Sequence, residues 1–209
     1  MRAARRWLGA ALLAAWAAAP GETRADRGGL TLELGPSLAV SPRWPVPLRG
    51  ATGFAAAAPG LVAGLRYATS NELELTLAGL FEAPAGGVAS VVDLGGVVVS
   101  TASASVSTWG ALFGVRFVFG LAWRFHLAAE MGWQHLACTR LSASDDAGGG
   151  TAGGGGRDAL ALAVGAGLDW QATDRLSLAL APRLELLPGA PAVVIVLVPV
   201  TLGYSWYVF

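Results

Sequence analysis

Apolar and polar side chains alternate with a period of two residues along most of this chain. In the segment ELELTLAGLFE at 72–82, leucines and a phenylalanine fall on one face, while glutamates and a threonine fall on the other. Such alternation is typical of a β-strand with two different faces, because successive side chains point to opposite sides of the backbone. The sequence predicts eight strands, near 29–40, 59–69, 72–82, 106–119, 122–138, 158–170, 175–187 and 192–209.

The chain is too apolar for an ordinary soluble domain. Hydrophobic residues make up 54% of it against 13% charged residues, and the mean hydropathy is +0.55, which indicates a membrane protein. After residue 25, no apolar stretch reaches the roughly 18–20 uninterrupted residues of a spanning helix. The best candidate, AVVIVLVPV at 192–200, is rich in β-branched residues and contains Pro199, so it is predicted to be a strand. Strands are therefore expected to cross the membrane.

Residues 1–25 have the pattern of a cleaved secretory signal peptide. Three arginines precede an apolar run from Trp7 to Ala19, and small residues then lead to a TRA cleavage site. Cleavage there would leave residues 26–209 as one domain with ten arginines and thirteen acidic residues. This slightly acidic balance argues against nucleic acid as a partner.

The predicted connections between strands alternate in length, except for the last, PGAP at 188–191. An up-and-down barrel in the bacterial outer membrane has this pattern, with short turns at the periplasmic rim and longer loops outside. Within one long loop, VVDLGGVVV predicts a hairpin that turns at 94–96, so that strands three and four project beyond the membrane. The short connections are 69–71, 120–121 and 171–174, and the long ones are 41–58, 83–105 and 139–157.

The strand near 122–138 indicates which face of the barrel contacts water and which contacts lipid. Large apolar side chains from Trp123 to Trp133 share one face, and charged or very small side chains share the other. If the apolar face pointed inward, the water-facing surface would fall well short of the roughly 25–35% charged residues of a soluble surface. We therefore predict that residues 26–209 form an eight-stranded antiparallel up-and-down transmembrane β-barrel, with the apolar face outward and a polar, side-chain-filled lumen.

Aromatic side chains are expected at two levels, because membrane barrels carry an aromatic girdle at each interface. The ten residue steps from Trp123 to Trp133 would cover roughly 23 Å when tilted by about 45°, close to an apolar band of ~25 Å. Trp109 and Trp133 are predicted near the outer rim. The periplasmic rim is predicted to hold Tyr67, Trp123, Trp170 and Trp206.

Charged residues on the inward faces are predicted to form a structural network, because buried charges need partners whatever the function. The network is expected to comprise Arg66, Glu74, Arg116, Arg124, His126, Glu130, Arg183 and Glu185. Four more charged residues are assigned to the same lumen face, namely Glu33, Glu82, Asp169 and Arg175. The near balance of charge favours mutual pairing over an ion-selective lining.

The C-terminal residues GYSWYVF, with Tyr207 and Phe209 two positions apart, resemble the signal by which the assembly machinery recognises outer-membrane β-barrels. Together with the eight strands, they make the chain similar to the small barrels of the OmpX/OmpA-like class. The resemblance implies a bacterial outer-membrane location, a lumen filled by side chains, and external loops that bind or shield. That class usually has a glycine five residues before the terminal aromatic, where this chain has Tyr204, with Gly203 one place off. This offset predicts a bulge or register shift in the last strand.

No catalytic, cofactor or metal site is predicted. His126 and Glu130 are four residues apart on one strand, about 13 Å, which is too far for a direct pair. The lipid A deacylases of this fold carry a His-x-Ser element, and here the corresponding HLA places Ala128 at the nucleophile's position. Asp145 and Asp146 lack the further oxygen ligands of a calcium site.

The sequence thus predicts a monomeric, non-enzymatic outer-membrane protein with a structural, adhesive or surface-shielding role through its loops. Its expected partners are outer-membrane lipid, the barrel-assembly machinery and an extracellular ligand of the loops. A narrow pore or transport protein is the first alternative, and a lipid-modifying enzyme is the second.

Overall fold

The computed structural model describes residues 28–44, 54–92, 98–120, 123–144, 150–152, 156–188 and 192–207. Within these ranges, no helix is long and apolar enough to cross a membrane. The predicted signal peptide at 1–25, the two aspartates at 145–146 and the terminal Phe209 lie outside the described residues.

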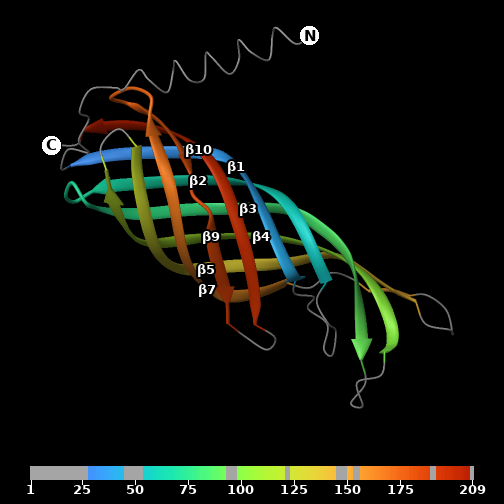
Figure 1. Ribbon diagram of the computed structural model, residues 1–209. Coiled ribbons are helices and arrows are strands. Elements are labelled where there is room, and N and C mark those ends of the chain that lie inside the picture. Colours follow the sequence, from blue (N-terminus) through green and yellow to red (C-terminus); the bar gives the residue numbers. More distant parts are fainter. Residues whose placement is uncertain are drawn as a thin grey trace, which may run out of the picture.

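Ten antiparallel strands make up the described fold (Figure 1). They are β1 (Gly29–Trp44), β2 (Phe54–Ala68), β3 (Leu73–Val92), β4 (Val98–Phe119), β5 (Trp123–Ser144), β6 (Gly150–Ala152), β7 (Gly156–Gln171), β8 (Leu176–Leu180), β9 (Arg183–Leu187) and β10 (Val193–Tyr207). Each of the eight predicted ranges is found as a strand, one of them divided into β8 and β9. The short β6 was not predicted.

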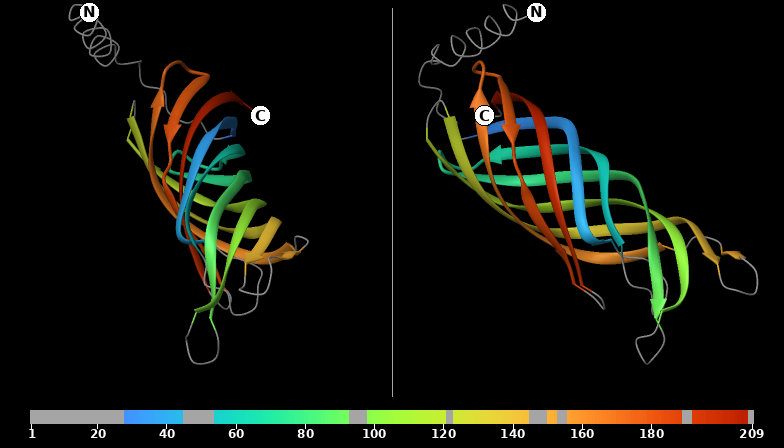
Figure 2. Two further views of the ribbon diagram at one scale, coloured as in Figure 1. Left: turned by 90° about the vertical axis from the view of Figure 1, so that its right-hand side faces the viewer. Right: turned by 45° about the vertical axis from the view of Figure 1, so that its right-hand side comes forward.

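The strands close into a barrel. From β1 to β5 each strand pairs with the next, and β5 then pairs with β7. Strand β7 pairs with both β8 and β9, both of these pair with β10, and β10 returns to β1. Because β8 and β9 both lie between β7 and β10, they occupy one position in the wall, and the barrel has eight strand positions. Figure 1 and Figure 2 show the curved wall that these strands form. The predicted eight-stranded up-and-down barrel is therefore confirmed.

Pro182 divides one strand of the wall into β8 and β9. Proline has no backbone N–H, so it cannot donate a bond to a central ladder. Hydrogen bonds to nearby carbonyls bridge the break: Ala166 N donates to the Pro182 carbonyl at 3.1 Å, and Ala181 N to the Pro199 carbonyl at 3.3 Å. The register with β10 is unchanged across the break. The predicted strand is thus correctly placed but interrupted.

Strands β3, β4 and β5 extend beyond the barrel at the loop end. The pairing of β2 with β3 ends at Gly60 and Glu82, whereas β3 continues against β4 as far as Val92 and Val98. A register shift after Glu82, around Pro84, marks the place where β3 leaves the barrel. The right-hand view of Figure 2 shows this projecting sheet. The predicted extension of strands three and four is confirmed, while its turn lies outside the described residues.

The last strand follows a single register, so the predicted bulge or register shift is wrong for Val193–Tyr207. The reason lies at Gly203, which points inward. A Cβ atom there would lie 2.5 Å from the Ser177 hydroxyl and 3.5 Å from the Arg66 guanidinium. Tyr204 points outward and is exposed. The glycine therefore stands where the lumen is crowded, and the tyrosine stands on the outer surface.

The two faces of each strand separate as predicted. On β3, the side chains of Leu75 and Leu77 are 46% and 51% exposed, whereas Glu74 between its apolar neighbours is 4% exposed. The other barrel strands repeat this alternation. The outer surface therefore carries a continuous band of exposed large apolar side chains, which a membrane barrel presents to lipid.

The lumen has two layers of different chemistry. Charged side chains fill the end next to the short turns. Towards the loops the lumen is packed mainly with apolar side chains, including Leu112, Ile195 and Leu197, each at 0% exposure. The lumen is therefore most polar at the turn end, whereas the loop end combines large apolar side chains with hydrogen-bonded polar ones such as Glu185 and Gln134.

Candidate functional site

A network of ionised side chains from six strands crosses the turn end of the lumen. Glu74 of β3 and Asp169 of β7 lie at its centre. Nη1 of Arg66 is 3.2 Å from Glu74 Oε2 and 3.0 Å from Asp169 Oδ2. Nη2 of Arg124 is 2.8 Å from Glu74 Oε1. Arg116 pairs with both carboxylates.

Two further side chains complete this lumen network. Nη2 of Arg66 is 2.9 Å from Glu33 Oε1, which adds β1 to the set. His126 Nδ1 lies 3.5 Å from Asp169 Oδ1. Three guanidinium groups thus face three carboxylates in a space that is almost closed to solvent. Such groups are stabilised only when each has its partners, because unpaired buried charges are costly.

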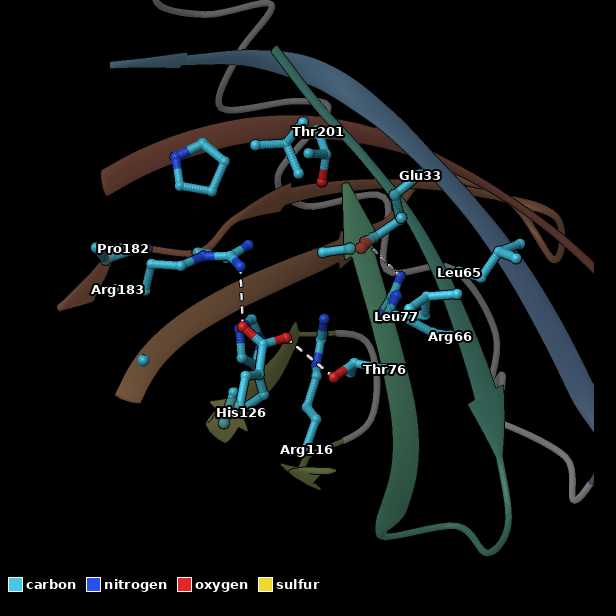
Figure 3. Close-up of a pocket in the computed structure, with 18 residues that line it drawn as sticks. Glu33, Leu65, Arg66, Thr76, Leu77, Arg116, His126, Pro182, Arg183 and Thr201 are labelled. Carbon is cyan, nitrogen blue, oxygen red and sulfur yellow. Dashed lines mark hydrogen bonds and ion pairs between the residues drawn. The ribbon is translucent and has the colours of Figure 1, made fainter. Parts of the chain in front are cut away.

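Glu130 and Arg183 form a second ion pair, one layer nearer the loops. Their Oε2 and Nη1 atoms are 2.9 Å apart, and the Thr76 hydroxyl donates to Glu130 Oε1 at 2.9 Å. A cavity of about 40 Å³ lies between this pair and the lumen network. Figure 3 shows Arg66, Arg116 and Arg183 converging on it from different strands.

Glu185, which was predicted as part of the network, lies in the apolar layer instead. Its Oε2 atom accepts a hydrogen bond from Gln134 Nε2 at 2.6 Å. Glu82 is in a similar position and accepts a hydrogen bond from the Thr108 hydroxyl. Neither carboxyl forms an ion pair among the described side chains. The predicted set is therefore divided between the lumen network, the Glu130–Arg183 pair and the apolar layer.

Arg175 does not lie in the lumen, contrary to prediction. It lies in the exposed turn between β7 and β8, where Nη1 is 3.4 Å from the Tyr204 hydroxyl. The alternation of side chains could not place Arg175, because β7 ends at Gln171 and β8 begins at Leu176, so this residue belongs to neither strand. Glu33 and Asp169 had been assigned to the lumen face without a place in the network. Glu33 lies near the start of β1, and Asp169 lies near the short turn after β7. These positions in the sequence could have indicated that both residues are level with Arg66.

Among the described lumen side chains, His126 and Glu130 have separate partners. Glu130 pairs with Arg183, and His126 faces Asp169 rather than Glu130. Ala128, two residues after His126, lines the cavity. Among the described residues, no group of three or more His, Cys, Asp or Glu side chains is placed to hold a metal ion.

The aromatic residues lie at the two predicted levels. At the outer rim, the rings of Trp109 and Trp133 are 4.7 Å apart and nearly perpendicular, at 81°. At the opposite rim, Trp123 and Trp170 stack at 6.3 Å and 25°. Leu30 of β1 pairs with Tyr67 on one side and with Trp206 on the other, at the same end of the barrel. These levels mark the two edges of the apolar band.

No family model matches the chain, and no curated protein matches its sequence. Among solved structures it is similar to Ail, the attachment invasion locus protein of Yersinia pestis, at 13% identity over 86% of this chain and 99% of that chain, with a TM-score of 0.52. Neisserial surface protein A matches at 11% identity over 85% and 99% of the two chains, with a TM-score of 0.55. OprG from Pseudomonas aeruginosa matches at 10% identity over 88% and 98%, with a TM-score of 0.55. The chain therefore has the fold of the small outer-membrane β-barrels, the class that its last residues resemble.

Proposed function

We propose that this transmembrane barrel resides in the bacterial outer membrane and acts as an adhesin through the sheet that projects beyond its loop end. In this proposal it is neither an open pore nor an enzyme. The observation that carries the proposal is the filled lumen, because a filled lumen leaves the external surface as the part that can meet a partner.

Two layers of side chains block the path through the barrel. The lumen network spans the turn end, and Leu112, Ile195 and Leu197 close the loop end without exposure to solvent. The cavity of about 40 Å³ has room for a few water molecules, since each needs at least ~10–15 Å³ measured in this way. An eight-strand barrel has little further interior space. This packing supports a plug rather than a pore.

The projecting sheet supports adhesion to a protein or to another weakly charged surface. Its hairpin segments AGGVASVV at 85–92 and VVSTASAS at 98–105 carry no charged residue and no aromatic residue. The segments predicted outside the membrane contain nearly equal numbers of basic and acidic residues, four against three: Arg43, Arg49, Arg140 and Arg157 against Asp93, Asp145 and Asp146.

Ail, which shares the fold, is named as an attachment protein, and another structure of it contains a heparin analogue, sucrose octasulfate. Attachment is consistent with the proposal for this chain. This nearly balanced charge is not the strongly basic surface that a polyanion would favour. We therefore propose that the partner is bound through backbone groups and small side chains.

The remaining partners of the proposal follow from the membrane fold. Outer-membrane lipid would surround the apolar band, and the barrel-assembly machinery would recognise the C-terminal strand through Tyr207 and Phe209. The barrel would act as a monomer, because its closed wall leaves no strand edge within the apolar band.

Adhesion is tested by shortening the hairpin. Gly86 pairs with Ser105, so replacing residues 87–104 with Asn-Gly would close β3 and β4 by a two-residue turn. Cells that express the full chain should adhere to immobilised extracellular-matrix protein, and cells with the shortened chain should not. Both chains should show the gel-mobility difference between boiled and unboiled samples that marks a folded barrel. Equal adhesion by both, or no adhesion above cells lacking the protein, would overturn the proposal.

The plug is tested in planar bilayers. The purified protein should insert without steady conductance. Reproducible open-channel currents from the wild-type chain would instead support the alternative of a narrow pore.

A further inference from the structure

The side chain of Arg175 is exposed at the rim next to the short turns. Its Nη1 atom is 3.4 Å from the hydroxyl oxygen of Tyr204, a β10 residue that faces outward and is 44% exposed. The Tyr204 ring lies 6.1 Å from the ring of Trp206. Trp206 belongs to the aromatic level at the edge of the apolar band, so the guanidinium group reaches the level at which lipid headgroups begin.

Hydrogen bonds hold the main chain of Arg175 on both sides. Its N–H donates to Thr173 Oγ1 at 3.3 Å, and its carbonyl oxygen accepts from the Ser205 N–H at 2.8 Å. The side chain therefore extends from a fixed point of the rim rather than from a free loop. A fixed starting point lowers the entropy that the side chain loses when it binds a ligand.

The turn itself does not need an arginine. The turn between β2 and β3 is built in the same way, because in both turns the first residue of the following strand donates to a hydroxyl three residues earlier. The distance is 3.1 Å from Leu73 N to Ser70 Oγ, and 3.0 Å in the turn of Arg175. The position that corresponds to Arg175 is occupied there by Glu72. The same turn thus accepts either charge, and its geometry does not explain the arginine.

Most hydrogen-bond donors of Arg175 are unused within the part of the chain that the structure describes. A guanidinium group has five N–H donors, and the side-chain contact found for this one is the long bond to the Tyr204 hydroxyl. No carboxylate of the described side chains forms an ion pair with it. The Tyr204 hydroxyl accepts from Arg175, so its own hydrogen can be donated to a ligand. The pair therefore presents a planar positive group and a hydroxyl donor at the membrane interface.

We propose that Arg175 and Tyr204 bind the phosphate group of a phospholipid in the periplasmic leaflet. A guanidinium group can donate two parallel hydrogen bonds to phosphate oxygens, and the tyrosine hydroxyl can donate a third. The rings of Tyr204 and Trp206 contact the apolar part of the same lipid, since they lie at the edge of the apolar band. This inference rests on the placement of the barrel in the outer membrane and not on the proposed adhesive role.

The binding is measured on the whole barrel with its arginines labelled with ¹⁵N, in a maltoside detergent, which carries no phosphate. Short-chain phosphatidylglycerol should shift the Nε–H signal of Arg175, which the variant Arg175→Gln identifies by its loss. Inorganic phosphate and a phosphate-free diacylglycerol, each at the same concentration, should shift this signal much less. An equal shift with inorganic phosphate would overturn the lipid assignment. An equal shift with the diacylglycerol, or no shift with phosphatidylglycerol, would overturn phosphate binding.

Substitutions of arginine separate charge from geometry, with the phospholipid retained by the barrel measured by native mass spectrometry. Arg175→Gln should weaken the binding of phosphatidylglycerol about tenfold, because the charge-assisted hydrogen bonds to phosphate are lost. Arg175→Lys keeps the charge without the planar group and should recover only part of the affinity. Arg157→Gln is the matched control, because it removes the same charge at the loop end of β7. Unchanged affinity in Arg175→Gln, or an equal loss in Arg157→Gln, would overturn the proposal, and full affinity in Arg175→Lys would overturn the pair of parallel bonds.

Tyr204→Phe tests the hydroxyl donor, because phenylalanine keeps the ring. The affinity should fall about threefold, as expected for the loss of one hydrogen bond, and unchanged affinity would remove Tyr204 from the site. The boiled and unboiled gel mobilities of each variant show whether the barrel is intact.

The membrane placement is tested in nanodiscs of phosphatidylglycerol. The Nε–H signal of Arg175 should lie at the position that it reaches in detergent when the short-chain lipid is saturating. A signal at the lipid-free position would overturn the assignment to a lipid of the surrounding bilayer.

Discussion

Arg66 and Asp169 are separated by 103 residues in the chain, yet Arg66 Nη1 lies 3.0 Å from Asp169 Oδ2 in the lumen. The two residues belong to β2 and β7, which are not neighbours in the wall. The contact therefore links strands across the barrel rather than along the sheet. Arg116 of β4 pairs with the same carboxylate. One aspartate thus joins three parts of the wall.

Asp169→Asn should destabilise the barrel strongly. The amide cannot neutralise Arg66 and Arg116, and breaking a buried ion pair by removing one partner typically costs about 3–5 kcal/mol. Urea unfolding in lipid vesicles, followed by gel mobility, would measure the loss. Asp174→Asn is the matched control, because Asp174 lies in an exposed turn and should change stability by less than ~0.5 kcal/mol. Equal effects of the two substitutions would refute the central role of Asp169.

Period-two alternation was sufficient to predict the barrel and the direction of its side chains. It placed Leu75 and Leu77 towards lipid and Glu74 towards the lumen, because a strand leaves only two directions. Connection lengths then gave the topology. To predict which charged residues form the lumen network, the distance of each residue from the short turns along its strand is also needed. Glu33 and Asp169 could have been matched with Arg66 by counting residues from the turn ends.

Other features depend on contacts that alternation does not encode. Leu112 shares the inward face with small residues and Arg116, and only the packed structure shows that it meets Ile195 and Leu197 in one layer. The interruption at Pro182 could have been expected from the missing N–H. The unchanged register on both sides of Pro182 could not have been expected from the sequence, because it depends on hydrogen bonds to carbonyl groups across neighbouring strands.

Leu77→Arg should be poorly tolerated, because Leu77 belongs to the apolar band and is 51% exposed on the outer surface. A lipid-facing arginine near the midplane costs about 2–4 kcal/mol. Thr76→Ser is the neighbouring control, since serine keeps the hydroxyl that donates to Glu130. Folding titrations into vesicles would compare the two variants. Similar free energies of unfolding would show that the assignment of the two faces is wrong.

Gly114→Ala and Gly79→Ala should differ although both replace a glycine within a strand. A Cβ atom at Gly114 would lie 2.1 Å from the Ala129 carbonyl oxygen, a backbone atom that cannot rotate away. At Gly79 the nearest atom is the Ala63 oxygen, at 3.7 Å. We expect a loss of about 1–3 kcal/mol at Gly114 from overpacking and no loss at Gly79, where alanine also reduces the chain entropy of the unfolded state. Urea midpoints would measure both, and a loss at Gly79 equal to that at Gly114 would contradict this account.

Deleting Phe209 should impair assembly in cells more than it impairs the folded barrel. The ladder between β1 and β10 reaches Gly29 and Tyr207, so the deletion removes no pair of the described ladder. If Phe209 acts with Tyr207 as the assembly signal, the loss should appear as less barrel in the outer-membrane fraction. The purified variant should still refold in detergent, with the wild-type urea midpoint. Phe209→Tyr keeps an aromatic ring at this position and should restore the outer-membrane level. A normal outer-membrane level after the deletion would show that the resemblance of the last residues does not extend to their role, whereas failure to refold in detergent would assign Phe209 to stability instead.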